Sequence, residues 1–155
     1  KIAHYLNKNL AVALLCLGDT SIFASSFYLK KEIKKIFPQL KITTIPGISS
    51  LSLAAALGDF QLIKHGEHLK IMECPDDISQ FNNLINQESK TVLAIMKVGK
   101  RWKWVKNALE EKNILSKSLL AVNLGMRNHF IGVASEYNSE ELPYFSLLLL
   151  RIGIE

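Results

Sequence analysis

The sequence predicts an α/β protein with two lobes and a mixed sheet, and three observations support this. Short apolar runs, such as residues 9–18 and 144–152, are typical of strands buried in a parallel or mixed sheet. Strand-like and helical segments alternate early in the chain, whereas strand-like segments follow one another after residue 118. The apolar runs are also shorter than the roughly 18 residues of a membrane-spanning helix, so no membrane span is expected.

The first lobe is expected to cover residues 1–46 and to be the C-terminal portion of an N-terminal parallel α/β lobe. Strand, helix and strand in this order predict a βαβ unit with a right-handed crossover. One such unit is too small to bury a doubly wound sheet, so we expect residues before Lys1 to be missing. The expected elements are a helix end at 1–8, a strand at 9–18, a helix at 21–37 and a strand at 41–46.

The second lobe is expected to cover residues 47–155 and to contain a mixed α/β sheet. A small-residue helix at 51–58 is capped by Ser49 or Ser50 and ends at Gly58. Two further helices are predicted, one opened by the Asp76-Asp77 pair and one from Trp102 to about Lys112. The expected strands are residues 69–74, 91–98, 118–125, 129–134 and 144–152.

The chain is basic, with 19 Lys+Arg against 14 Asp+Glu and a net charge of +5. This excess indicates either a solvated lysine surface or a polyanionic partner, namely a nucleic acid or a small polycarboxylate. Helical spacing places Trp102 in the core and Trp104 on an outer face, where it is available to stack a base. Without an Arg-rich helix or interleaved aromatic residues, a nucleic-acid partner is not favoured. Cys16 and Cys74 form no CxxC motif, which favours reduced thiols and a cytoplasmic location.

Two turns at expected strand ends are the strongest candidates for a binding site. Residues 17–22 follow the first strand, and residues 45–50 follow the second. Ligands of open α/β sheets bind outside the carboxyl ends of strands, so the two turns are expected to share one pocket. Asp19 is alternatively a simple helix N-cap, and the second turn is alternatively a capped interdomain turn.

Other chemistry has little support in the sequence. His65 and His68 lie three residues apart, but no third ligand is evident, so no metal site is expected. The sequence contains no GxGxxG, Walker A, GxSxG or HExxH motif. The usual dinucleotide, phosphate, acyl-transfer and zinc-protease interpretations are therefore not favoured.

The order of motifs along the chain resembles the tetrapyrrole (corrin/porphyrin) methylase family. The matching segments are LGDTSIFASSFYL at 17–29, TTIPGISSLSLAAALG at 43–58, IMKVGKRW at 95–102, NLGM at 123–126 and YFSLLLL at 144–150. Within the family, the PGISS and YFS segments are most similar to the precorrin-2 carbon-20 methyltransferases of cobalamin biosynthesis. The resemblance covers nearly the whole chain.

The resemblance implies a two-domain enzyme that methylates a tetrapyrrole carbon, as a homodimer, with S-adenosylmethionine held in the cleft between the lobes. It assigns no catalytic residue. The positions that match the family's cofactor-binding motifs are Leu17, Gly18, Asp19, Ile22, Ser49, Ser50, Met96, Leu124 and Gly125.

The sequence departs from the family pattern in two places. Thr20 stands where the family usually has a proline after the Gly-Asp pair, so this loop is expected to be less rigid. The family's glycine-rich N-terminal loop is absent, which is consistent with a fragment, a truncated gene product or one half of a split enzyme. Two alternative functions therefore stand beside methylation of a tetrapyrrole: a non-catalytic remnant of the fold, and an RNA-methylating relative.

Overall fold

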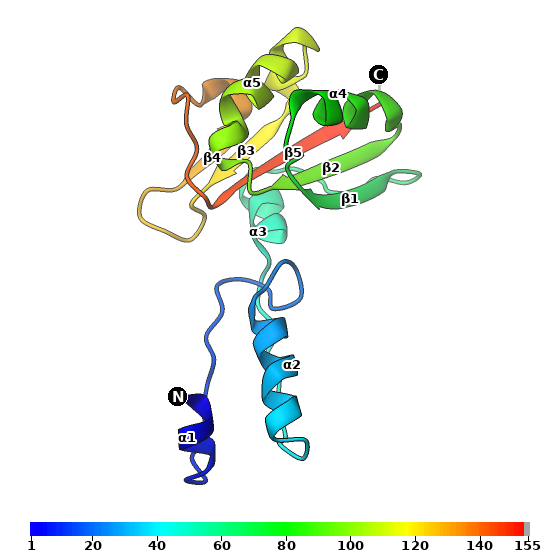
Figure 1. Cartoon of the computed structure of the whole chain (residues 1–155). Coiled ribbons are helices and arrows are strands. Elements are labelled where there is room, and N and C mark those ends of the chain that lie inside the picture. Colours follow the sequence, from blue (N-terminus) through cyan, green and yellow to red (C-terminus); the bar gives the residue numbers. More distant parts are fainter. Residues whose placement is uncertain (154–155) are drawn as a thin grey trace. The chain divides into compact units, whose positions relative to one another are not determined.

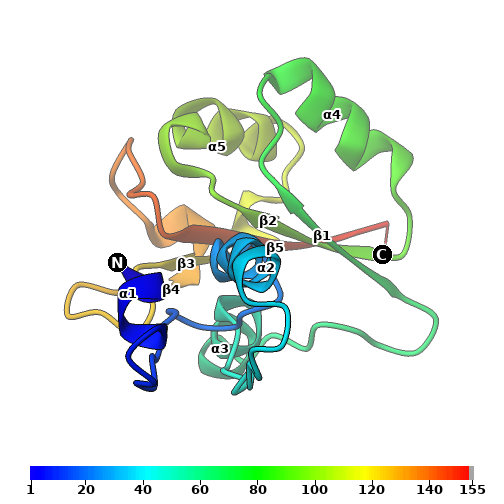
Figure 2. The same ribbon diagram turned by 60° about the horizontal axis from the view of Figure 1, so that its bottom comes forward.

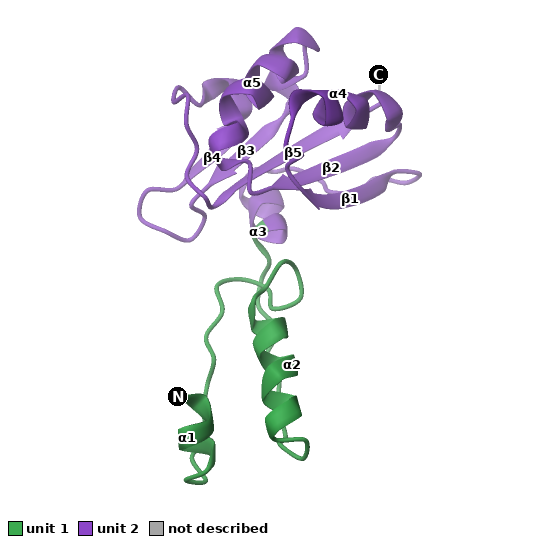
Figure 3. Ribbon diagram, in the orientation of Figure 1, with its two compact units in different colours: residues 1–50 green, residues 51–155 purple. Residues whose placement is uncertain are grey.

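A computed structural model describes residues 1–153, and the chain divides into two compact units (Figure 3). Unit 1 is Lys1–Ser50, and unit 2 begins at Leu51. None of the helices in residues 1–153 is long and apolar enough to cross a membrane. Each unit is described by itself below.

Unit 1 contains two helices joined by irregular chain. Helix α1 is Ile2–Leu6 and helix α2 is Ser26–Ile36, with no fully buried residue in either. The helix predicted at 21–37 is confirmed, although its first turn begins at Ser26, and Pro38 follows its C-terminal end. Its last turn contains Lys34 and Lys35, and positive charge near a helix C-terminus stabilises the helix by interacting with its dipole.

The two strands predicted in unit 1 are wrong. Residues 9–18 and 41–46 have no regular secondary structure, so the expected βαβ unit does not form. An apolar run indicates a tendency to be buried, but a strand also needs a hydrogen-bonded neighbour, and these segments have none within the unit. Leu15 and Ile45 are 91% and 80% exposed, which shows how little of this apolar chain unit 1 covers.

Unit 2 is built on a five-stranded mixed sheet in the order β1-β2-β5-β3-β4 (Figure 1). β1 and β2 are parallel, whereas β5 runs antiparallel to both β2 and β3, and β4 runs antiparallel to β3. All five strands predicted for the second lobe are confirmed. Their bounds are β1 His68–Glu73, β2 Thr91–Met96, β3 Leu119–Val122, β4 Phe130–Val133 and β5 Ser146–Ile152.

Helices cover both faces of this sheet. Helices α4 (Ile78–Gln87) and α5 (Trp102–Glu111) pack on one face through the larger apolar cluster, which includes Phe81 and Leu148 (Figure 2). Helix α3 (Ser50–Leu57) packs on the other face, where its Ala54 contacts a smaller cluster. Three short 3-10 helices lie in the connections, at Gly99–Arg101, Leu115–Lys117 and Ala134–Glu136.

The helix ends follow the sequence signals. The Asp77 carboxylate caps α4 by accepting a hydrogen bond of 2.8 Å from the N–H of Gln80. Gly58 follows the last residue of α3, and a Cβ at this position would lie 2.4 Å from a methyl carbon of the Leu119 side chain. The end of α3 therefore packs closely on the sheet at this glycine.

The two tryptophans of α5 differ in burial, and only one of them lies where the sequence predicted it. Trp102 is fully buried, as predicted, and its indole N–H donates to the carbonyl of Ser139 at 3.1 Å. Trp104 was expected on an outer face, and this is wrong. Its ring packs edge-to-face against Phe81, with centroids 5.6 Å apart, because α4 lies beside α5 and covers it.

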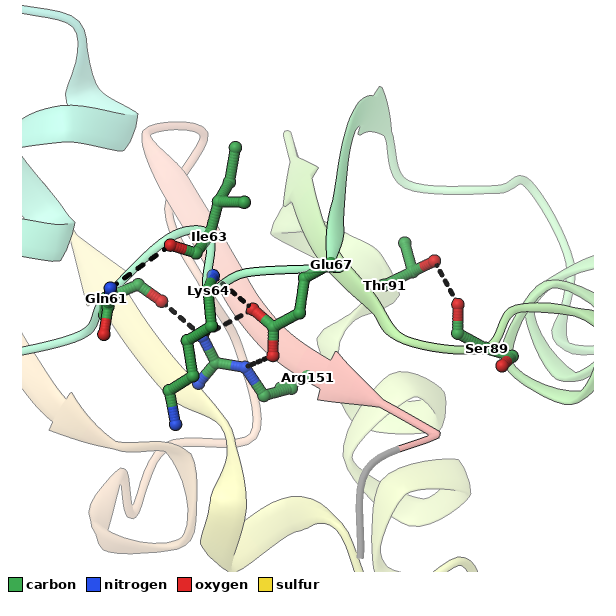
Figure 4. A network of polar contacts seen from close by, with 7 residues as sticks. All are labelled: Gln61, Ile63, Lys64, Glu67, Ser89, Thr91 and Arg151. Carbon is green, nitrogen blue, oxygen red and sulfur yellow. Dashed lines mark hydrogen bonds and ion pairs between the residues drawn. The ribbon is translucent and has the colours of Figure 1, made fainter.

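A buried ion pair fastens the loop between α3 and β1 to strand β5 (Figure 4). The Nε of Arg151 lies 2.8 Å from Oε1 of Glu67, whose side chain is only 4% exposed. Arg151 also donates to the carbonyl of Gln61, and Glu67 accepts from the N–H of Lys64 at 2.7 Å. The guanidinium lies 5.0 Å from the centre of the Phe60 ring.

Glu67→Gln is expected to lower the thermal midpoint of unfolding at neutral pH by about 4 °C or more, because it leaves Arg151 without a counter-ion. Burial raises the pKa of Glu67, but the Lys64 N–H and Arg151 outweigh it, so the pKa lies below its ordinary value. The stabilisation is therefore complete above the ordinary pKa and is lost as the pH falls through the lowered one.

Thermal unfolding scans of the chain and of Glu67→Gln from neutral pH downward test this expectation. The difference between them should shrink at acid pH. Glu32→Gln is the control, since Glu32 pairs with Lys35 on an exposed surface. Equal effects of the two substitutions, or a difference that persists at acid pH, would contradict the prediction.

Candidate functional site

The two turns singled out in unit 1 lie against each other through their backbones. A Cβ built on Gly47 would lie 2.3 Å from the carbonyl oxygen of Gly18, and one built on Gly18 would lie 3.4 Å from the carbonyl oxygen of Ile48. Gly18 also has a φ of +78°, in the left-handed region that favours glycine. A side chain at Gly47 would therefore block this approach, and one at Gly18 would strain the backbone.

Asp19 is held by its own loop. Both the N–H and the hydroxyl of Ser21 donate to Oδ1 of Asp19, at 2.5 Å each. These two bonds, the hydroxyl first, hold the pKa of Asp19 below its ordinary value. The alternative that Asp19 caps a helix is wrong, because α2 begins only at Ser26 with Ser25 before it. The carboxylate thus shapes a turn at the contact between the two loops.

The remaining predicted positions of unit 1 surround this contact. Ser49 is buried, and Ser50 begins α3, with its N–H 3.9 Å from the position of a Cβ on Gly18. Ile22 is half-buried, whereas the side chain of Leu17 is 69% exposed. The structure therefore brings the two turns together around Gly18 and Gly47 and leaves an apolar side chain exposed beside them.

In unit 2, the carboxyl ends of β1, β2 and β3 lie at the same edge of the sheet, together with the amino end of β5. We call this the carboxyl edge. Met96 ends β2 and Leu124 follows β3, and both pack partly buried against the apolar cluster on the α3 face. Gly125 has a φ of +79°, and no atom lies within 4 Å of where its Cβ would be. These three predicted positions therefore share one edge, with open space at Gly125.

Charged residues at the carboxyl edge were missed by the sequence analysis. Nζ of Lys97, the residue after β2, pairs with Oε1 of Glu73 at the end of β1. Arg101 pairs in the same way with Asp76. No residue-type signal marks these pairs, because the partners are 24 and 25 positions apart. The parallel pairing of β1 and β2 brings their ends together.

The backbone at Lys97 is unusual and is held in place from both sides. Its φ is +57°, in a region that lysine seldom adopts. Its N–H donates to the carbonyl of Ser146 at 3.1 Å, and its carbonyl accepts from Nη1 of Arg101 at 3.5 Å. The hydroxyl of Ser146, which is buried, accepts in turn from the N–H of Gly99 at 3.0 Å. The surrounding structure thus fixes this conformation.

The cysteines and histidines form no reactive cluster in the part of the chain that the structure describes. Both cysteines are free thiols, and burial raises the pKa of Cys74 to about 11, which makes it a poor nucleophile. Residues 1–153 hold no group of three His, Cys, Asp or Glu side chains placed to bind a metal ion. His65 and His68 are both exposed.

The chain belongs to the tetrapyrrole (corrin/porphyrin) methylase family, which it matches over residues 1–137. Among curated proteins it is similar to a precorrin-2 C(20)-methyltransferase of Sinorhizobium sp, with 26% identity over 149 residues. That match includes 96% of this chain and 59% of the relative, so the chain spans about three fifths of the relative's length.

Solved structures confirm the fold class. The methyltransferase CobJ superposes with a TM-score of 0.66 at 17% identity, over 97% of this chain and 68% of CobJ. A putative cobalamin synthesis related protein, CobF, from Corynebacterium diphtheriae superposes with a TM-score of 0.62 at 17% identity, over 99% of this chain and 69% of that one. At this identity, the likeness concerns the fold alone.

Proposed function

We propose that the chain is part of an S-adenosylmethionine-dependent enzyme that methylates carbon 20 of precorrin-2 or cobalt-precorrin-2 in cobalamin biosynthesis. The observation that supports this most is the alignment with a precorrin-2 C(20)-methyltransferase along 96% of the chain. The family match supports the coarser proposal, methylation of a tetrapyrrole. We further propose that the complete enzyme is a cytoplasmic homodimer.

The residues present fit the methyl donor. In unit 1, Gly18 and Gly47 bring two backbones close enough for polar main-chain groups to bind a ligand, and Leu17 adds an exposed apolar wall. In unit 2, Met96 and Leu124 offer apolar surface suited to an adenine ring, beside open space at Gly125. We propose that both sets contact the donor, together with Asp19, Ile22, Ser49 and Ser50.

We propose that methyl transfer at this site, in the complete enzyme, needs no catalytic acid. When bound, S-adenosylmethionine supplies a methyl group on a positively charged sulfur, which keeps the electron pair of the broken bond while the new carbon–carbon bond forms. We propose that Met96, which is partly buried in unit 2, offers the donor an apolar surface that keeps water from the reacting atoms. The turns at Gly18 and Gly47 fix the line of attack, on which the rate depends strongly. A triad or paired carboxylates are therefore not required.

A non-catalytic remnant is the second candidate, and one observation favours it. Unit 1 contains two apolar segments, residues 9–18 and 41–46, that pair with no strand in that unit. While these segments are unpaired, the turns that follow them are held less firmly. The position of the donor depends on those turns. We accordingly expect weak donor binding and little turnover by the chain alone.

Transfer of radiolabel from S-adenosyl-[methyl-³H]methionine tests the proposal. The chain is assayed with precorrin-2, cobalt-precorrin-2 and bulk RNA, alone and co-expressed with the part of the Sinorhizobium relative that it does not match. We expect label in a tetrapyrrole only in the co-expressed sample. Label in RNA would move the assignment to RNA methylation, and no label or donor binding in either sample would favour the remnant.

A further inference from the structure

We propose that Lys97 binds a carboxylate group of the ligand at the carboxyl edge, and that Glu73 holds Lys97 in position until that carboxylate arrives. The inference rests on the proposed function, which supplies two sources of carboxylate, the amino-acid end of the methyl donor and the acidic side chains of a tetrapyrrole. Lys97 would bind either carboxylate through the same kind of ion pair.

The strained backbone is the first step of the argument. A lysine with a φ of +57° is strained and persists only where the surrounding structure holds it, and Lys90 shares this region with a φ of +49°. Here the carbonyl of Ser146 and the guanidinium of Arg101 bind the N–H and the C=O of Lys97. Asn123 occupies the equivalent position after β3 with a φ of +50°, but asparagine adopts this region readily.

The position of Lys97 is the second step. Its ammonium group pairs with Glu73, which lies opposite Met96 in the β1–β2 register, and Met96 is the residue that the family resemblance assigns to donor binding. The N–H of Lys97 donates to the carbonyl of Ser146, the first residue of β5, and the N–H of Asn123 donates to the carbonyl of Phe145 just before β5. The same edge carries the side chains of Tyr144 and Phe145, which are 65% and 51% exposed and suit a planar ligand.

The pair with Glu73 is the third step. The side chains of Lys97 and Glu73 are 33% and 49% exposed, and ion pairs in contact with water are weak. An incoming carboxylate can therefore replace Glu73 at small cost. Arg101 is held likewise by Asp76, which is 83% exposed. The carboxyl edge therefore carries two positively charged side chains, Lys97 and Arg101, whose acidic partners are easily displaced.

Two substitutions with opposite expected effects test this mechanism. Lys97→Met should weaken binding of the carboxylate ligand by about tenfold or more, whereas Lys97→Arg should retain most of it. Glu73→Gln should strengthen binding by about threefold, because it removes the competing acid. A merely structural pair would give losses for both Lys97→Met and Glu73→Gln.

The pair formed by Lys70 and Glu88 provides matched controls. Lys70 lies on β1 like Glu73, its Nζ is 2.6 Å from Glu88, and the pair sits away from the carboxyl edge. Lys70→Met and Glu88→Gln change the net charge as the test variants do. We expect both controls to bind as the unaltered chain does, and thermal unfolding verifies that every variant is folded.

Binding to the full chain is measured with uroporphyrin by absorbance titration, and with S-adenosylhomocysteine and its decarboxylated analogue by calorimetry. A loss confined to uroporphyrin supports a tetrapyrrole carboxylate as the partner of Lys97. A loss for S-adenosylhomocysteine that is absent with the decarboxylated analogue supports the donor's carboxylate. Equal effects at Lys97 and Lys70, or weaker binding by Glu73→Gln, overturn the inference while the proposed function stands. If neither the unaltered chain nor the sample co-expressed with the unmatched part of the Sinorhizobium relative binds any of these ligands, both fail.

Discussion

Replacing Trp102 with alanine is expected to lower the free energy of unfolding of the chain by about 3–5 kcal/mol. Trp102 is fully buried between α5 and the sheet, and its loss opens a cavity in the larger apolar cluster. It also leaves the carbonyl of Ser139 without the indole donor. Since small domains unfold at a cost of about 5–15 kcal/mol, this change should bring unit 2 close to unfolding.

Denaturant unfolding followed by circular dichroism measures this effect. Trp104→Ala is the matched control, because it removes the same side chain from the same helix at a half-buried position. We expect it to cost clearly less than Trp102→Ala. Equal losses would mean that the edge-to-face contact of Trp104 with Phe81 is as important as full burial.

Gly47→Ala is expected to weaken binding of S-adenosylhomocysteine by about tenfold or more. The added methyl group would lie 2.3 Å from the carbonyl oxygen of Gly18, so the two turns of unit 1 must separate. Because that oxygen belongs to the backbone, no flexible side chain can move aside. The proposed donor-binding turns would then lose their relative position.

Calorimetric titration with S-adenosylhomocysteine, of the chain co-expressed with the unmatched part of the Sinorhizobium relative, checks this result. Gly66→Ala is the control, since no atom lies within 4 Å of a Cβ on Gly66, although its φ of +79° adds some strain. The control should bind as the unaltered chain does. Undiminished binding by Gly47→Ala would exclude the contact between the turns from the donor site.

The fold of unit 2 could be predicted from the sequence because its apolar runs are bounded by clear turn and capping residues. Asp77 and Gly58 mark helix ends where the structure has them. The same reasoning failed in unit 1, where residues 9–18 are as apolar as a strand but have no neighbour to pair with. Hydrophobicity predicts which segments tend to be buried. Strand formation also requires a neighbouring strand, and the residue pattern of a single segment does not reveal whether one is available.

Residues of the candidate site were predictable from the sequence only where the residue type determines which backbone conformations are possible. The turns that contain Gly18 and Gly47 were expected to share one pocket, which stays a prediction, and the structure places the two glycines in contact. The left-handed backbone of Lys97 has no such signal, because it results from hydrogen bonds to Ser146 and Arg101 that only the tertiary structure creates. Arg151 did carry a signal, since a charge within an apolar strand requires a buried partner.

The central place of β5 determines when unit 2 can fold during synthesis. β5 pairs with both β2 and β3, yet it is the last of the five strands to leave the ribosome. Until residue 152 has emerged, the nascent chain holds a β1–β2 pair and a β3–β4 hairpin, each with an unpaired apolar edge. Such edges favour aggregation with other chains. The sheet of unit 2 can therefore be completed only after residue 152 has left the ribosome.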